Sequence, residues 1–232
     1  MTVPNIPKKL PLWAPEESLI HIGSLRPQDK GTESYEGHGL SVSECPGSWE
    51  QIAKLGGNPW WNLERENANF LDWHRVSKTM RAAILEWGIA NDLCKPCDVH
   101  IVEFYDVDLE ERRTFSYDTA AEAHESYDDM LAEDEENVVK PELKIEKGHR
   151  LSIDACRLVG RRTTNLDETA TMVALLWIER ETALDGIYWH APDDPNSYTA
   201  PRAVILPGKV AEWQITPYPG REQPIERPRS RG

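Results

Sequence analysis

The apolar segments of this chain are short and irregularly spaced, and this pattern limits the folds that it can adopt. Short apolar runs at 18–22, 40–43, 186–189 and 203–206 predict brief buried strands. Stretches with apolar residues three and four positions apart predict helices among them. A doubly wound parallel sheet would need strands and helices in regular alternation, which the sequence lacks. We therefore expect an α+β fold with mixed small sheets and flanking helices.

Further elements follow from the same two periodicities. Helices are expected at 46–55, 69–90, 119–136 and 167–182, further strands at 98–108 and 142–153, and a loop at 26–39. Four prolines make residues 1–17 an expected extended lead-in. We expect a single domain over 1–216 and a Pro- and Arg-rich, disordered tail at 217–232.

Composition indicates a folded acidic protein. Of the 232 residues, 39% are hydrophobic and 28% are charged, which is typical of a globular chain. The net charge of −14 argues against broad electrostatic capture of nucleic acid or anionic membrane. No apolar run approaches the roughly 20 residues of a membrane span, and no signal-peptide pattern is visible, so a cytoplasmic location is expected.

One segment concentrates the negative charge. Eight carboxylates and no lysine or arginine occur from Glu122 to Glu136. Such a run is usually a solvated helix face, and otherwise a docking surface for a basic protein partner.

The cysteines and histidines do not form an evident metal site. Cys94 and Cys97 have the spacing of a redox pair or of half a zinc site, but reduced thiols in a turn are the favoured interpretation. The seven histidines form no short ligand cluster, and the common phosphate-loop, zinc-protease and serine-hydrolase motifs are absent. We predict no metal site.

The segment from Leu19 to Trp49 is the best candidate for chemistry. His21 lies near the end of an apolar strand and just before Gly23 and Ser24, where backbone could approach a ligand. Tyr35 in a glycine-containing loop could stack on a flat heterocycle. Gly39, Ser41 and Ser43 are small residues on one face of the next strand and would leave room there for a ligand. The alternatives are that His21 is a core histidine and Tyr35 a loop anchor.

Together these residues resemble the front half of the ADP-ribosyltransferase fold of diphtheria-toxin-like and PARP-like enzymes. His21, Gly23 and Ser24 match the family's His-Gly-Ser element with one residue inserted. Gly39, Leu40, Val42 and Ser43 match its second strand. The resemblance covers roughly residues 18–55 and 185–215. It implies that NAD⁺ binds there, with His21 holding a ribose and an aromatic ring stacking on nicotinamide.

Two positions differ from the family pattern. Ser41 stands at the place of the stacking tyrosine, so Tyr35 would supply the ring. Arg202 stands at the place of the catalytic glutamate, where it would better suit a phosphate than a positively charged transition state. Asp185, Asp194 or Glu181 could supply the carboxylate instead. Asp185 and Arg202 are therefore the predicted catalytic residues.

Three functions remain open from the sequence. The first is a divergent NAD-dependent ADP-ribosyltransferase, a glycosyltransferase in its chemistry, acting on a protein or nucleic acid, for example as a toxin or phage-conflict effector. The second is a non-enzymatic acidic protein such as an antitoxin, inhibitor or polyanion mimic. The third is a nuclease or other nucleic-acid-processing enzyme, for which exposed tryptophans and the basic tail would supply the contacts.

Overall fold

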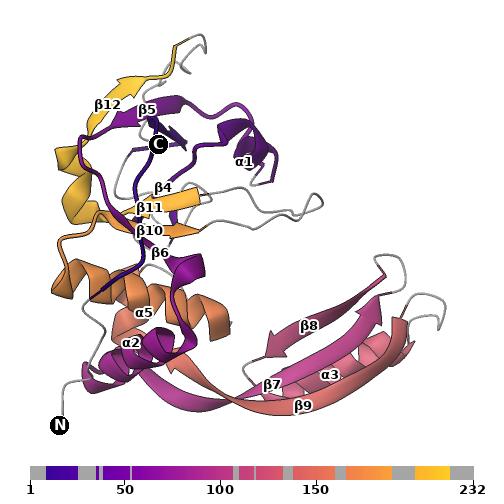
Figure 1. The fold of residues 1–232 in the computed structure, drawn as a ribbon. Helices are drawn as coiled ribbons and strands as arrows, with labels where there is room; N and C mark the ends of the chain where they lie inside the picture. The colour runs from indigo at the N-terminus through magenta and orange to yellow at the C-terminus, as the bar shows by residue number, and fades with distance from the viewer. Residues whose placement is uncertain are drawn as a thin grey trace, which may run out of the picture. The chain divides into compact units, whose positions relative to one another are not determined.

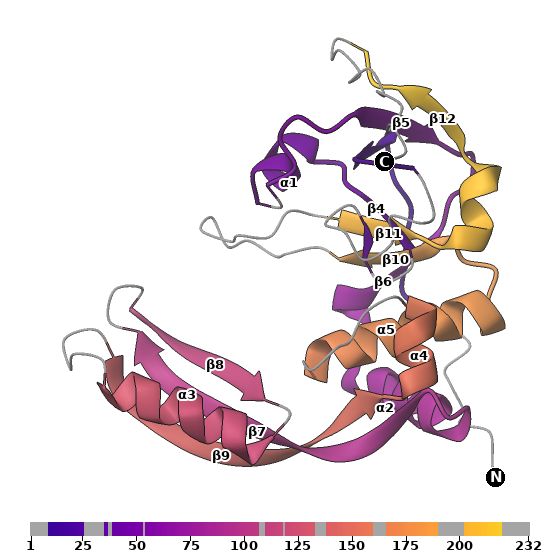
Figure 2. The same ribbon diagram turned by 180° about the vertical axis from the view of Figure 1, so that it is seen from behind.

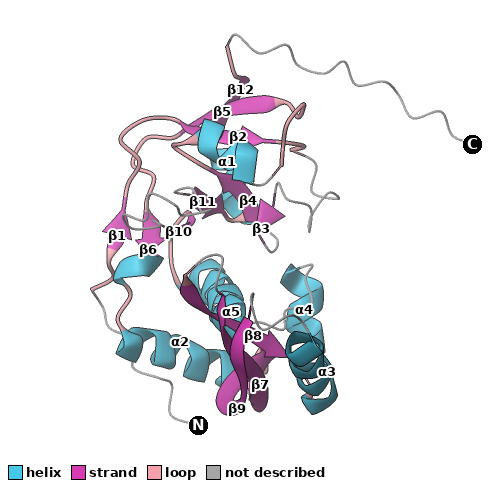
Figure 3. Cartoon of the chain, turned by 90° about the vertical axis from the view of Figure 1, so that its right-hand side faces the viewer, coloured by secondary structure: helices cyan, strands magenta, loops and turns pink. Residues whose placement is uncertain are grey.

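The computed structural model describes residues 9–25, 35–36, 39–52, 54–106, 110–117, 119–132, 138–159, 166–189 and 202–219. Within these ranges the chain is a mixture of helices and small sheets, as expected from the sequence (Figure 3). None of the helices in the described ranges is long and apolar enough to cross a membrane.

The chain divides into two compact units. The one-sheet unit comprises residues 1–4, 82–157 and 162–174, and the two-sheet unit comprises 5–81, 158–161 and 175–232. The sequence predicted one domain over 1–216. Three of the boundaries fall inside helices, namely α2 (Lys78–Ala90), α4 (Ile153–Val159) and α5 (Leu166–Glu181), so no linker composition marks them.

The two-sheet unit contains a six-stranded and a three-stranded sheet (Figure 1). The six-stranded sheet has the order β1 (Leu12–Trp13), β6 (Phe70–Asp72), β10 (Gly186–Trp189), β11 (Arg202–Ile205), β4 (Gly39–Val42) and β3 (Tyr35–Glu36). The three-stranded sheet has the order β12 (Gln214–Pro217), β5 (Trp60–Glu64) and β2 (Leu19–Ile22). Short helical segments in this unit are α1 (Pro46–Ile52) and the 3-10 turns η2 (Trp73–Arg75) and η3 (Pro207–Glu212).

The two sheets share one buried cluster, and the small sheet has a second cluster on its opposite side. Leu19 and Leu63 from the small sheet share a buried cluster with Leu40, Phe70 and Ile205 from the large one. The opposite side of the small sheet forms a second cluster, in which Ile20, Ile22 and Trp60 pack with Trp49 of α1 and with Leu55. Successive side chains of β2 thus point into different clusters, as the two-residue period of a strand requires.

The one-sheet unit is built on a long antiparallel sheet. Its strands lie in the order β8 (Glu111–Tyr117), β7 (Cys94–Asp106) and β9 (Val138–Leu151). Helix α3 (Ala120–Ala132) packs along this sheet, and α4 (Ile153–Val159) follows β9 (Figure 2). The predicted helix at 119–136 corresponds to α3, and the predicted strands at 98–108 and 142–153 correspond to parts of β7 and β9.

Several sequence predictions were wrong in their extent. The predicted helix at 69–90 begins only at Lys78, because Phe70–Asp72 is a strand buried on both faces and its apolar residues fit either period. The lead-in contains β1, which pairs with β6 through Leu12 and Trp13. The expected loop at 26–39 contains β3, which pairs with β4. Strands β5, β8 and β12 were also not predicted. Of the predicted tail, Pro217 still belongs to β12, and residues 220–232 lie outside the described ranges.

Candidate functional site

Strand β2 brings His21 against the neighbouring sheet. Ile20 and Ser43 exchange two backbone hydrogen bonds of 3.0 and 2.9 Å, so β2 lies directly beside β4. The Nδ1 atom of His21 lies 2.7 Å from the carbonyl oxygen of Ser41, and its Nε2 atom lies 3.2 Å from the carbonyl oxygen of Ser24. The imidazole therefore connects the two sheets within one unit.

Burial controls the charge of this imidazole. His21 is fully buried, and the loss of solvation lowers its pKa from 6.5 to about 4, although both carbonyl contacts act in the opposite direction. At neutral pH the ring is uncharged and has one N–H group. The shorter distance to Ser41 favours a proton on Nδ1, which would donate to that carbonyl. His21 is thus a buried core histidine whose two ring nitrogens face backbone carbonyls, which is the alternative that the sequence left open.

The turn after His21 is held by the neighbouring strand. Gly23 has a φ of 129°, which favours glycine. Its N–H donates to the carbonyl of Pro59 at 2.9 Å, and its own carbonyl accepts from Nε1 of Trp61 at 2.9 Å. Ser24, whose carbonyl faces His21, is half-buried. Gly23 and Ser24 are therefore fixed in place next to the imidazole, as a binding turn would require.

Strand β4 places the predicted small residues in tight packing. Ser41 and Ser43 are buried, and Oγ of Ser43 accepts from the N–H of Cys45 at 2.9 Å, just before α1. A side chain added at Gly39 would overlap Val204. The backbone of Tyr35 pairs with Leu40, while its side chain lies outside the described part. Small residues here allow the strands to approach each other.

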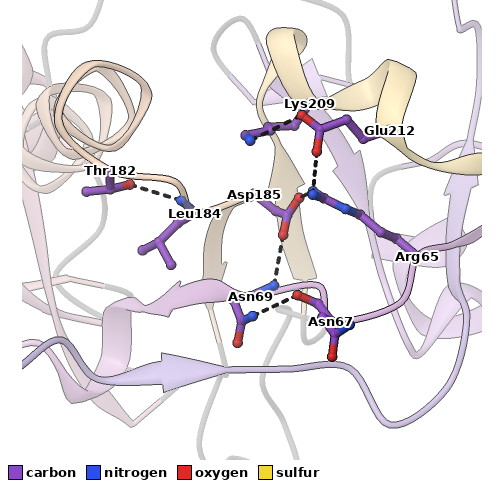
Figure 4. A network of polar contacts seen from close by, with 8 residues as sticks. All are labelled: Arg65, Asn67, Asn69, Thr182, Leu184, Asp185, Lys209 and Glu212. Carbon is purple, nitrogen blue, oxygen red and sulfur yellow. Dashed lines mark hydrogen bonds and ion pairs between the residues drawn. The ribbon is translucent and has the colours of Figure 1, made fainter.

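Asp185 belongs to a polar network at the start of β10 (Figure 4). Its carboxylate forms an ion pair with Arg65 and accepts from the N–H of Asn69 at 2.8 Å. Arg65 also pairs with Glu212, which in turn lies 3.2 Å from Nζ of Lys209. This network joins the end of β5 to β6, β10 and η3, so Asp185 has a clear structural role.

Arg202 lies at the other end of the same strand pair. Gly186 is opposite Ile205 and Trp189 is opposite Arg202, so Asp185 and Arg202 are separated by the length of β10. The guanidinium carbon of Arg202 lies 5.6 Å from the ring centroid of Trp189, a cation–π contact. The two residues predicted to be catalytic are therefore not together. Of the other carboxylates considered, Glu181 is the exposed last residue of α5, and Asp194 lies outside the described residues.

Glu44 is a carboxylate at the Arg202 end that the sequence analysis missed. It follows β4, whose Val42 is opposite Ala203, the neighbour of Arg202. The pKa of the buried Tyr188 rises to about 12, mainly because burial disfavours the charged phenolate. Electrostatic repulsion from Glu44, Asp72 and Cys45 contributes to the rise in that order. The only sequence signal was its position directly after Ser43, at the end of a predicted site strand.

The cysteines do not form a site within the described residues. Cys94 and Cys97 lie in strand β7, not in a turn, and a three-residue step in a strand directs them to opposite faces. Burial raises the pKa of Cys94 to about 11, so this thiol is unreactive. No group of three or more His, Cys, Asp or Glu residues that could hold a metal ion occurs in the part of the chain that the structure describes.

Comparison of the chain with protein-family models, with curated proteins and with solved structures gave no match.

Proposed function

We propose that the two-sheet unit binds NAD⁺ beside β2, β4 and β11 and acts as an ADP-ribosyltransferase-like enzyme. The observation that supports this best is the order of these three strands. β2, which carries His21, lies beside β4, which carries Gly39 and Ser41, and β4 pairs with β11, which begins at Arg202. The three segments that resemble the family in sequence are thus consecutive neighbours.

The chemistry of the residues fits the binding of NAD⁺. Arg202 offers a permanent positive charge for a pyrophosphate, and Trp189 beside it offers an aromatic face. Gly23 and Ser24 offer backbone groups in a fixed turn. His21 is a positioning residue in this proposal, because its ring nitrogens face the carbonyls of Ser41 and Ser24.

Glu44 is the residue that we assign to the reaction. Loss of nicotinamide leaves positive charge on the ribose, and a carboxylate at that point stabilises the transition state. Asp185 lies at the opposite end of β10 from Arg202, so it does not suit this role. Glu44 lies at the same strand end as Arg202 and is exposed.

The rate of nicotinamide release distinguishes the proposed role of Glu44 from that of Asp185. Wild-type protein incubated with NAD⁺ is expected to release nicotinamide, by hydrolysis or by transfer to a protein or nucleic-acid acceptor. Glu44→Gln is expected to lower this rate roughly 100-fold, the size of effect that loss of an electrostatic stabiliser produces. Asp185→Asn should retain the rate at temperatures where it stays folded. Equal rates for Glu44→Gln and wild type would exclude the assignment of Glu44.

The second candidate function rests on helix α3. Glu122, Glu125, Asp128 and Asp129 are all exposed, whereas Ala123 is buried, so the helix presents its carboxylates to solvent. This favours capture of a basic protein by an acidic inhibitor or polyanion mimic. Such binding should weaken with added salt. Persistence of binding after all four carboxylates are changed to amides would exclude α3 as the contact.

A further inference from the structure

Strand β9 lies at an edge of the sheet in the one-sheet unit. The order of the sheet is β8-β7-β9, and in the described residues β9 pairs with β7 alone. From Glu142 to Leu151 the register with β7 is regular, and it shifts only before Glu142. An edge of this length leaves a row of backbone donors and acceptors that another strand can pair with.

The side chains along this edge are exposed on both faces. From Glu142 to Lys147 none is buried, and Ile145 is 66% exposed. Lysines on an edge commonly prevent pairing, but here Lys144 lies 2.6 Å from Glu103 and Lys147 lies 2.5 Å from Asp98. Both lysines are thus held across the sheet by carboxylates of β7.

We propose that two copies of this chain associate through β9, paired antiparallel about a two-fold axis at Ile145. In this register Ile145 faces Ile145 of the second copy. Lys144 faces Glu146 of the second copy, and Glu146 faces its Lys144, so opposite charges meet on both sides of the axis. Leu143 faces the aliphatic stem of Lys147. In this register the strand is therefore self-complementary in charge.

Neighbouring registers are less favourable. An axis at Lys144 or at Glu146 places like charges directly opposite each other. An axis at Leu143 requires pairing across the irregular part of β9 and across Pro141, which has no N–H group to donate. The axis at Ile145 uses only Glu142 to Gly148, all within the regular part. This interface is independent of the proposed NAD⁺ site.

Cross-linking tests the register directly. Residues on a two-fold axis of an antiparallel pair have Cα atoms about 4.5–5.5 Å apart, within the range of about 4.4–6.8 Å for a disulfide. Ile145→Cys should therefore form a covalent dimer under mild oxidation. Leu143→Cys should not, because in this register its twin is four residues away, roughly 13 Å. Wild-type protein, with its own four cysteines, gives the background.

Sedimentation velocity tests the predicted charge pairs between Lys144 and Glu146 across the interface. Wild type should show a reversible monomer–dimer equilibrium between about 1 µM and 1 mM, the range expected for a small interface. Glu146→Lys should raise the dimer dissociation constant about tenfold, since it opposes Lys144 twice. Glu110→Lys makes the same charge change at the exposed turn between β7 and β8, away from β9, and should leave the dissociation constant nearly unchanged. A wild type that stays monomeric throughout, or stronger cross-linking through Leu143→Cys than through Ile145→Cys, would overturn the proposal.

Discussion

The Nδ1 atom of His21 lies 2.7 Å from the carbonyl oxygen of Ser41, so one buried side chain connects β2 of the small sheet to β4 of the large sheet. The charge state of this ring therefore affects the stability of the two-sheet unit. Tryptophan fluorescence reports on this unit, since of the nine tryptophans only Trp87 lies in the other.

The first prediction concerns pH. The pKa of His21 falls from 6.5 to about 4 on folding, so the unfolded chain binds more protons between these values and acid destabilises the native state. The contribution of His21 is complete above pH 6.5 and is lost as pH falls toward 4. Between pH 7 and pH 5 we expect a loss of about 2 kcal/mol from this residue. Urea unfolding at both pH values measures it.

His21→Gln is the control, because its side chain is polar and does not titrate. The difference between wild type and His21→Gln should shrink by about the same 2 kcal/mol on going from pH 7 to pH 5. Parallel pH dependence of the two proteins would show that His21 is not buried in its neutral form.

The second prediction concerns the ion pair of Asp185 and Arg65. Asp185 is buried, so Arg65→Met leaves a buried carboxylate without its counter-charge and should cost about 3 kcal/mol of unfolding free energy. Arg112→Met removes an arginine that is 76% exposed and should cost less than about 1 kcal/mol. Similar losses for the two variants, measured by urea unfolding, would contradict the structural role of Asp185.

The third prediction concerns close strand packing. A side chain at Gly186 would overlap the backbone carbonyl of Val204, and one at Gly39 would overlap the side chain of Val204. Gly186→Ala should therefore cost more than about 3 kcal/mol, because a backbone must move, and Gly39→Ala less. Gly47→Ala, with nothing nearby, is the control. Thermal unfolding ranks the three, and a Gly186→Ala protein as stable as Gly47→Ala would contradict the pairing of β10 with β11.

The fourth prediction concerns cysteine reactivity. Cys45 is exposed, whereas Cys94 is buried with a pKa of about 11. Iodoacetamide at pH 8 should modify Cys45 first and Cys94 last, because the thiolate is the nucleophile. Peptide mass spectrometry over time measures the order. Early modification of Cys94, or a native Cys94–Cys97 disulfide, would contradict the placement of these residues in β7.

Local patterns in the sequence predicted many elements but not their partners. Strands β2, β4, β10 and β11 follow from short apolar runs, and α3 and α5 from helical periodicity. The predicted helix at 69–90 includes Phe70 because a fully buried strand and a buried helix have the same pattern over a few residues. The sequence does not predict β8 because only Phe115 and Tyr117 alternate as apolar residues there, and three charged residues precede them.

The candidate site was predictable only where its residues lie in one strand or turn. His21, Gly23 and Ser24 are local, and their proximity follows from the turn. Asp185 and Arg65 are 120 positions apart, and only the fold brings them together. Without the β10–β11 register, the sequence could not show that Asp185 and Arg202 lie at opposite ends, or that Glu44 lies near Arg202.

A calorimetric titration with NAD⁺ shows directly whether the two-sheet unit binds this nucleotide through Arg202. We expect saturable binding to wild type, at least tenfold weaker binding to Arg202→Gln through loss of a charged contact, and unchanged binding to Arg112→Gln. Absence of saturable binding to wild type up to about 1 mM NAD⁺, a binding free energy weaker than about −4 kcal/mol, would contradict the proposal. Equal affinity of wild type and Arg202→Gln would place any NAD⁺ site elsewhere.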